Sequence, residues 1–168
     1  MGSSLSMLWG TNDNVIDPAT NLSGKQKKLV LSTWNILKKD PTSTGVAIMT
    51  AYFKKYPEYQ KFFVSFKDIP LEELPGNHKF QAHCLNVITA LGIAIDAINN
   101  PPLLEASLTN LGERHRKRGQ TREHFDHLKV VVLEVLSASL GSKYTLEVRD
   151  AWSRTLDTTF ECICKELS

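Results

Sequence analysis

Apolar side chains recur every three or four residues along most of the chain, which is the spacing of helices that bury one face. The clearest run predicts a helix over residues 77–98, with apolar positions at Phe80, Cys84, Val87, Leu91 and Ile95. The same spacing predicts further helices over residues 23–40, 43–55, 101–118, 122–140 and 145–163. We expect an all-α fold of seven to eight helices and no sheet.

Polar residues and prolines mark where these helices begin and end. Ser23 and Gln26 fit a capping box, in which each side chain bonds the backbone N–H of the other residue. Pro41 and Pro57 each end a helix, because the residue before a proline is driven out of the helical region. Residues 67–76 contain two prolines and a glycine, so we predict a loop there with one short turn.

Residues 1–21 show no apolar period and are rich in Ser, Asn, Thr and Gly. We therefore predict a flexible leader, followed by one domain over residues 22–168.

The net charge of +2 is too small to indicate nucleic-acid binding. No apolar run approaches the roughly 20 residues that span a bilayer. An odd number of cysteines (three) argues against a disulfide framework and favours a reducing, intracellular compartment such as the cytoplasm.

No standard catalytic motif is present, and the chemistry rests on five histidines. His83 shares a helix face with Val87, and His115 shares one with Leu111. A single histidine on an apolar face is usually only a core or rim residue. Two of them on separate helices favour a shared metal or haem, although spacing alone does not show that they face each other.

Short motifs in a fixed order run through nearly the whole chain. The stretch HCLNVITALG at residues 83–92 and the stretch LGERH at residues 111–115 are two of them. The remaining pattern consists of Trp34, Phe53, Pro57, Phe63 and Phe66. Together these features make the sequence from Leu22 to Leu167 resemble the globin family.

The resemblance implies a globin fold that binds haem b. It makes His115 the proximal iron ligand and places His83 on the distal side, touching a bound gas or binding the iron directly. The second ring nitrogen of His115 is then expected to bond the carbonyl of Leu111. The other residues implied at the haem are Met49, Phe63, Phe66, Val87, Leu91, Leu111 and Phe125.

Two further expectations follow from the resemblance. Gly45 and Cys84 stand where small residues let the second globin helix cross the distal helix closely. Asn86 stands where some globins place a cation near a haem propionate. That leaves Arg116, Lys117 and Arg118 as candidate propionate partners.

The expected function is reversible binding of O₂, NO or CO, with a redox or signalling role and bis-histidyl iron. Nitrite reduction and NO dioxygenation remain open as side activities, and we do not expect enzymatic turnover to be the main function. One alternative is a simple O₂ storage or transport globin with an open sixth iron site. A second alternative, from another class, is a haem-free helical sensor or interaction module.

Two features bear on partners. The basic cluster over residues 114–118 has two interpretations. One is a solvated helix end, and the other is a docking patch for an acidic redox partner or an anionic membrane. No aromatic residues lie beside it on which the bases of a nucleic acid could stack.

Met1-Gly2 begins a sequence that matches the N-myristoylation pattern, and the match is equally explained by chance or by a cloning remnant. The stretch at residues 66–74 resembles the membrane-attached globin X group, in which some N-termini are acylated, and so keeps membrane attachment through Gly2 open.

Overall fold

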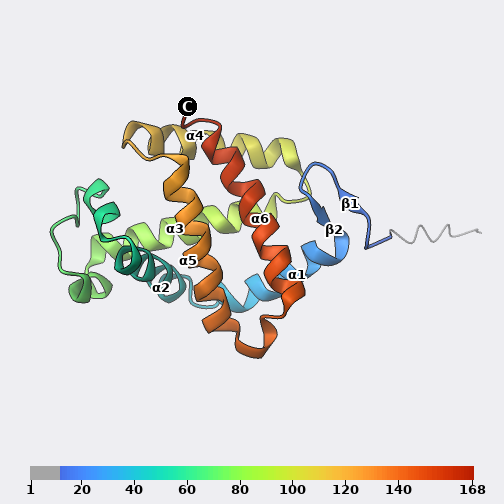
Figure 1. Ribbon diagram of the computed structural model, residues 1–168, viewed down its shortest axis with the longest axis horizontal. Coiled ribbons are helices and arrows are strands. Elements are labelled where there is room, and N and C mark those ends of the chain that lie inside the picture. Colours follow the sequence, from blue (N-terminus) through green and yellow to red (C-terminus); the bar gives the residue numbers. More distant parts are fainter. Residues whose placement is uncertain (1–11) are drawn as a thin grey trace, which may run out of the picture.

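Helices make up nearly all the regular structure of the chain in a computed structural model, which describes residues 12–168 (Figure 1). The α-helices are α1 Gly24–Leu37, α2 Pro41–Lys55, α3 His78–Asp96, α4 Pro101–Lys117, α5 Arg122–Leu140 and α6 Leu146–Cys164. Three short 3-10 helices connect them: η1 Pro57–Phe62, η2 Leu71–Gly76 and η3 Gly141–Lys143. The all-α prediction is confirmed, and η2 is the short turn expected within residues 67–76.

Helix starts follow the local sequence. The capping box of α1 is confirmed, because Ser23 Oγ accepts from the Gln26 N–H while Gln26 Oε1 accepts from the Ser23 N–H. Asn77 caps α3, its side chain accepting from the Phe80 N–H at 3.0 Å. Helix α3 therefore begins at a defined residue, which fixes where His83 emerges about one and a half turns later.

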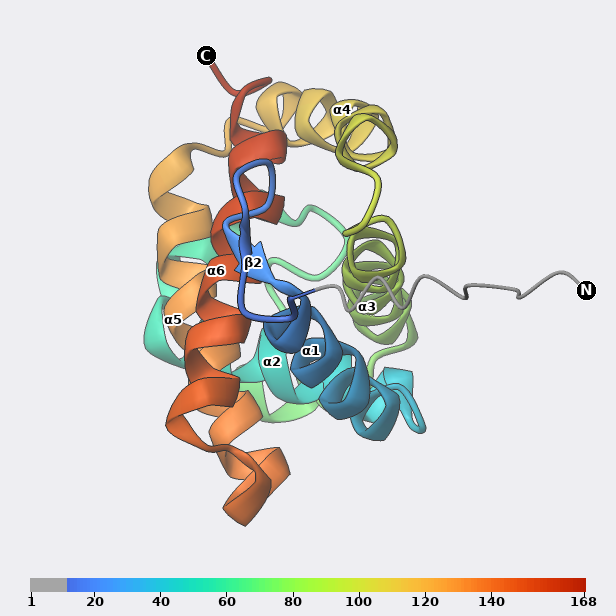
Figure 2. The same ribbon diagram turned by 90° about the vertical axis from the view of Figure 1, so that its right-hand side faces the viewer.

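Two helices, α2 and α6, make most of the contacts that build the scaffold. Helix α2 packs against α3 and α5, and α6 packs against α1, α4 and α5. In Figure 2, α5 and α6 lie side by side, α3 stands on the opposite side of the molecule, and α4 crosses the top, where it packs on α6. This arrangement leaves α3 to face α5 and α6 across the interior, with α4 closing one end.

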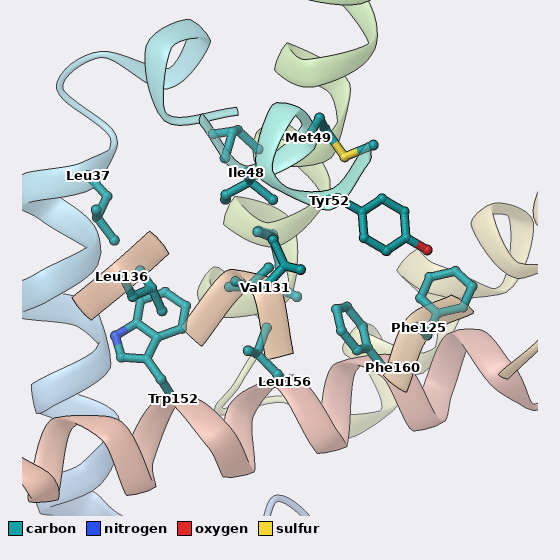
Figure 3. Packing of buried hydrophobic residues seen from close by; sticks show 14 of the residues in the cluster. Leu37, Ile48, Met49, Tyr52, Phe125, Val131, Leu136, Trp152, Leu156 and Phe160 are labelled. Carbon is teal, nitrogen blue, oxygen red and sulfur yellow. The ribbon is translucent and has the colours of Figure 1, made fainter. Parts of the chain in front are cut away.

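The core fills the space between these helices. Figure 3 shows residues from α1 and α2 meeting Val131 and Leu136 of α5 and Leu156 and Trp152 of α6. The Trp152 indole N–H donates to Thr33 Oγ1 at 2.8 Å, so the one polar atom of the largest core side chain is satisfied.

Helices α2 and α3 cross with almost no space between their backbones. A Cβ placed on Gly45 would collide with the Cys84 carbonyl oxygen and would lie 2.8 Å from the Cys84 carbonyl carbon. Only glycine permits this approach. The predicted crossing of Gly45 and Cys84 is thus confirmed.

A small antiparallel sheet precedes α1, contrary to the prediction of no sheet. Strand β1 Ile16–Asp17 pairs with β2 Leu22–Ser23, and Asn21 takes a left-handed φ of 57° in the turn. Lys27 Nζ lies 2.8 Å from Asp17 Oδ2, and Thr158 of α6 donates to the Thr20 carbonyl. Two-residue strands carry no alternating pattern, so sequence periodicity does not reveal them.

None of the helices described within residues 12–168 has the length and hydrophobicity needed to span a lipid bilayer.

Candidate functional site

A cavity of about 370 Å³ lies between α3, α4, α5 and α6. Eleven of its nineteen lining residues are aliphatic or aromatic, and the other eight are polar or charged. Such a mainly apolar cavity with a few converging polar groups is typical of a small-molecule or cofactor site.

His115 enters this cavity from the last turn of α4. Its Nδ1 lies 2.7 Å from the carbonyl oxygen of Leu111. A carbonyl can only accept, so Nδ1 carries the proton and donates, which confirms the expected Leu111 partner. The Nε2 lone pair is then free to bind a metal ion. Phe125 packs its ring edge-on against the imidazole, with ring centroids 5.3 Å apart.

His83 enters the same cavity from α3. Burial, the nearby His115 and then Arg118 lower the pKa of His83 to about 4. Burial also lowers the pKa of His115, although its hydrogen bond to Leu111 opposes that shift. At neutral pH both imidazoles are therefore neutral, which is the form that binds a metal ion. Phe63 holds His83 in place, with ring centroids 4.8 Å apart in an edge-on contact.

Six of the nine sequence-predicted haem residues line the cavity: His83, Val87, Leu91, Leu111, His115 and Phe125. The other three are not among the lining residues. Phe63 and Phe66 both reach the site through ring contacts with His83, with centroids 4.8 Å and 5.9 Å away, and Phe66 also packs on Phe80. Met49 is 2% exposed within the core between the helices.

The sequence did not point to several residues that the fold brings to the cavity. Helix α6 contributes Thr159, Phe160 and Ile163, and α4 contributes Leu108 and Arg114. The period of α6 shows that Phe160 and Ile163 are buried, but no local signal shows which cavity a buried face meets. Of the three cations proposed as propionate partners, Arg118 lines the cavity and Arg116 and Lys117 do not.

Two arginines therefore mark one edge of the cavity. Arg114 and Arg118 are both exposed, and neither pairs with a carboxylate within residues 12–168. Guanidinium groups bind carboxylates in a two-pronged geometry. This edge suits the acidic end of a ligand whose body lies in the apolar interior.

Fold and cavity together define a class: an all-helical protein whose interior site, with two neutral imidazoles, suits a metal-centred cofactor. The profile of the Globin family matches residues 46–163. The chain belongs to the globin family.

Individual relatives agree with this assignment. The extracellular globin-E1 of Artemia sp. is 34% identical over 115 residues, which are 68% of this chain and 59% of that relative's length. The neuroglobin of Dissostichus mawsoni is 29% identical over 132 residues, covering 78% of this chain and 83% of the relative. The hexacoordinate haemoglobin of Drosophila melanogaster, which has a haem cavity and binds cyanide, superposes with a TM-score of 0.78 at 30% identity. That match covers 84% of this chain and 93% of the fly protein.

The residues of this chain fit a haem. The cavity is mainly apolar, His115 Nε2 can bind a metal ion, and a second neutral imidazole lines the same space. Two arginines without an ion-pair partner within residues 12–168 stand at its edge. Family membership and the haem-protein neighbour support haem binding.

Proposed function

We propose that this globin binds haem b with His115 as the proximal iron ligand, binds diatomic gases such as O₂, NO and CO at the distal side, and has a redox or signalling role. The observation that carries the proposal is the meeting of two neutral, largely buried imidazoles from different helices in one apolar cavity. Haem iron supplies gas binding and one-electron chemistry.

The proximal side depends on the bond between His115 and Leu111. Donation from Nδ1 fixes the tautomer and the ring plane, and it makes Nε2 a stronger donor to iron. Phe125 and Leu111 keep water away from this nitrogen. Arg114 and Arg118 would hold the propionates of a bound haem at the cavity edge.

The distal side depends on His83. Its depressed pKa keeps the ring neutral, so it can bind the iron as a sixth ligand or donate a hydrogen bond to a bound gas. Ligation by both histidines lets the iron change oxidation state with little change in its ligands, which favours the redox or signalling role. The hexacoordinate fly relative supports this choice. An open sixth site would instead favour O₂ storage or transport.

We also propose an intracellular, cytoplasmic location. All three cysteines are free, as in a reducing compartment. The myristoylation pattern at Gly2 lies outside the described residues, and membrane attachment through it stays a proposal, as does docking of an acidic redox partner on the basic end of α4.

Haem retention in matched histidine variants tests the site. His115→Ala should lose haem to an apoglobin acceptor far faster than wild type. His83→Ala should retain haem but change the absorption spectrum of the haem. His78→Ala serves as the control, because His78 is exposed at the first turn of α3, away from the cavity lining. Wild-type haem retention in His115→Ala would overturn the proximal assignment.

A further inference from the structure

A cluster of tyrosine and histidine rings lies outside the cavity lining, where α2 and η1 meet α5. The Tyr59 hydroxyl oxygen is 2.7 Å from Nδ1 of His127. Tyr56 stacks on the His127 ring with centroids 4.3 Å apart and planes 4° from parallel. Tyr59 is 9% exposed, whereas Tyr56 and His127 are half-buried. The cluster therefore extends from the interior to the surface.

An unbroken series of ring contacts joins this cluster to the cavity. Phe63 lies against His83 with ring centroids 4.8 Å apart, and Phe53 lies 5.2 Å from Phe63. Tyr52 follows at 5.6 Å from Phe53, and Tyr59 follows at 5.4 Å from Tyr52. Electrons pass between aromatic rings in contact more readily than across empty space. The series thus connects the distal histidine with Tyr59.

The two inner tyrosines differ in what receives their phenol proton. Tyr52 donates to the backbone carbonyl of His124 at 2.9 Å, and an amide carbonyl is too weak a base to take the proton. Tyr59 Oη meets an imidazole nitrogen, and no other hydrogen-bond partner reaches it among residues 12–168. Burial raises the pKa of Tyr59, so its phenol stays protonated until an acceptor takes the proton as the electron leaves. Among the tyrosines that the structure describes, only Tyr59 combines a buried phenol with a base.

We propose that Tyr59 and His127 form a proton-coupled electron donor. The pair supplies electrons to the oxidised haem pocket and is itself reduced again from the protein surface. The inference rests on the haem binding proposed above, and its co-reactant is a hydroperoxide. The hydroperoxide takes two electrons from the haem protein and two protons as its O–O bond breaks, giving water and an alcohol or a second water.

Tyr59 returns one of those two electrons through the ring series, and a second oxidation of Tyr59, after its reduction, returns the other. Its Oη–H bond breaks as the electron leaves, and the proton moves to Nδ1 of His127. The products are a neutral tyrosyl radical and an imidazolium. An external one-electron reductant, such as an enediol or a thiolate, restores Tyr59 through the stacked Tyr56 edge, and His127 returns the proton. The pair thereby limits oxidative damage at the haem.

Freeze-quench EPR spectroscopy of the haem-loaded protein after addition of hydrogen peroxide tests this pair. The wild type should give a tyrosyl signal that shows a hyperfine coupling to an exchangeable proton. In D₂O this proton coupling should disappear while the tyrosyl signal remains. Tyr59→Phe should lose the signal. His127→Phe keeps a ring in the stack but removes the base, and should lose the signal although Tyr59 remains. A purely structural role for His127 would not produce that loss.

Two matched variants serve as controls. Tyr52→Phe keeps the ring series but removes the phenol that has no base, and should keep the signal. Tyr144→Phe alters a phenol that lies in the turn between α5 and α6 and has no hydrogen-bond partner within the described residues, and should also keep it. A wild-type signal in Tyr59→Phe, or the absence of any tyrosyl signal in haem-loaded wild type, would overturn the pair alone. A chain that takes up no haem would overturn the haem proposal as well, and the absorption spectrum identifies that case before peroxide is added.

Discussion

The crossing of α2 and α3 yields a quantitative prediction, because His83 depends on where α3 lies. Gly45→Ala adds one methyl group at the closest approach of the two backbones. That Cβ would collide with the Cys84 carbonyl oxygen and lie 3.0 Å from Ile88 Cγ1. The colliding group is backbone, so no side-chain rotation relieves the contact and the helices must separate.

Two opposing effects set the magnitude. Alanine favours a helix interior over glycine by about 1 kcal/mol. Overpacking a core costs roughly 1–3 kcal/mol, and a rigid backbone contact belongs at the upper end of that range. The net loss in the free energy of unfolding is therefore about 2 kcal/mol. For a chain of this size that is a fall of roughly 4–8 °C in Tm.

Gly92→Ala is the matched control on α3. A Cβ there would lie 3.5 Å from Trp34 Cζ2, an ordinary van der Waals contact, so we expect a stabilisation of up to about 1 kcal/mol. The assay is equilibrium urea unfolding of both haem-free variants, with a haem absorption spectrum of each loaded form. Equal or higher stability for Gly45→Ala than for Gly92→Ala would refute the crossing argument.

Two more predictions concern buried polar groups. Thr33→Val removes the acceptor of the Trp152 indole N–H and should lower the free energy of unfolding by about 1–3 kcal/mol. Thr33→Ser keeps a hydroxyl and should lower it by less. An unchanged urea midpoint for Thr33→Val would contradict this prediction. Burial holds the pKa of His83 near 4, below the ordinary 6.5, so protonation costs the folded state more than the unfolded state. The stability of the haem-free protein should therefore decline as the pH falls from about 6.5 to about 4, and His83→Phe should flatten that decline; identical pH profiles would rule out the assignment.

Helix periods and end signals predict most of this fold because they are local. The capping box at Ser23 and Gln26 needs only four residues, and the proline at 57 stops α2 whatever surrounds it. The crossing at Gly45 was predictable for a different reason, since the family resemblance supplies the partner that spacing alone lacks.

The parts that sequence did not predict depend on contacts between distant residues. The pairing of Ile16–Asp17 with Leu22–Ser23 is held by Lys27 and Thr158, and a two-residue strand has no period of its own. Arg114 lines the cavity because α4 ends beside it, whereas the sequence does not show which of the basic residues around His115 face that cavity. The bond between Tyr59 and His127 joins residues 68 positions apart.

The absorption spectrum of the haem-loaded protein, reduced and kept free of O₂, tests the central claim most directly. Ligation by both His115 and His83 predicts the sharp, split visible bands of a low-spin haem, and His83→Ala should convert them to one broad high-spin band. A broad high-spin band in the wild type would contradict bis-histidyl ligation and favour O₂ storage or transport. A wild-type chain that takes up no haem would contradict the account as a whole.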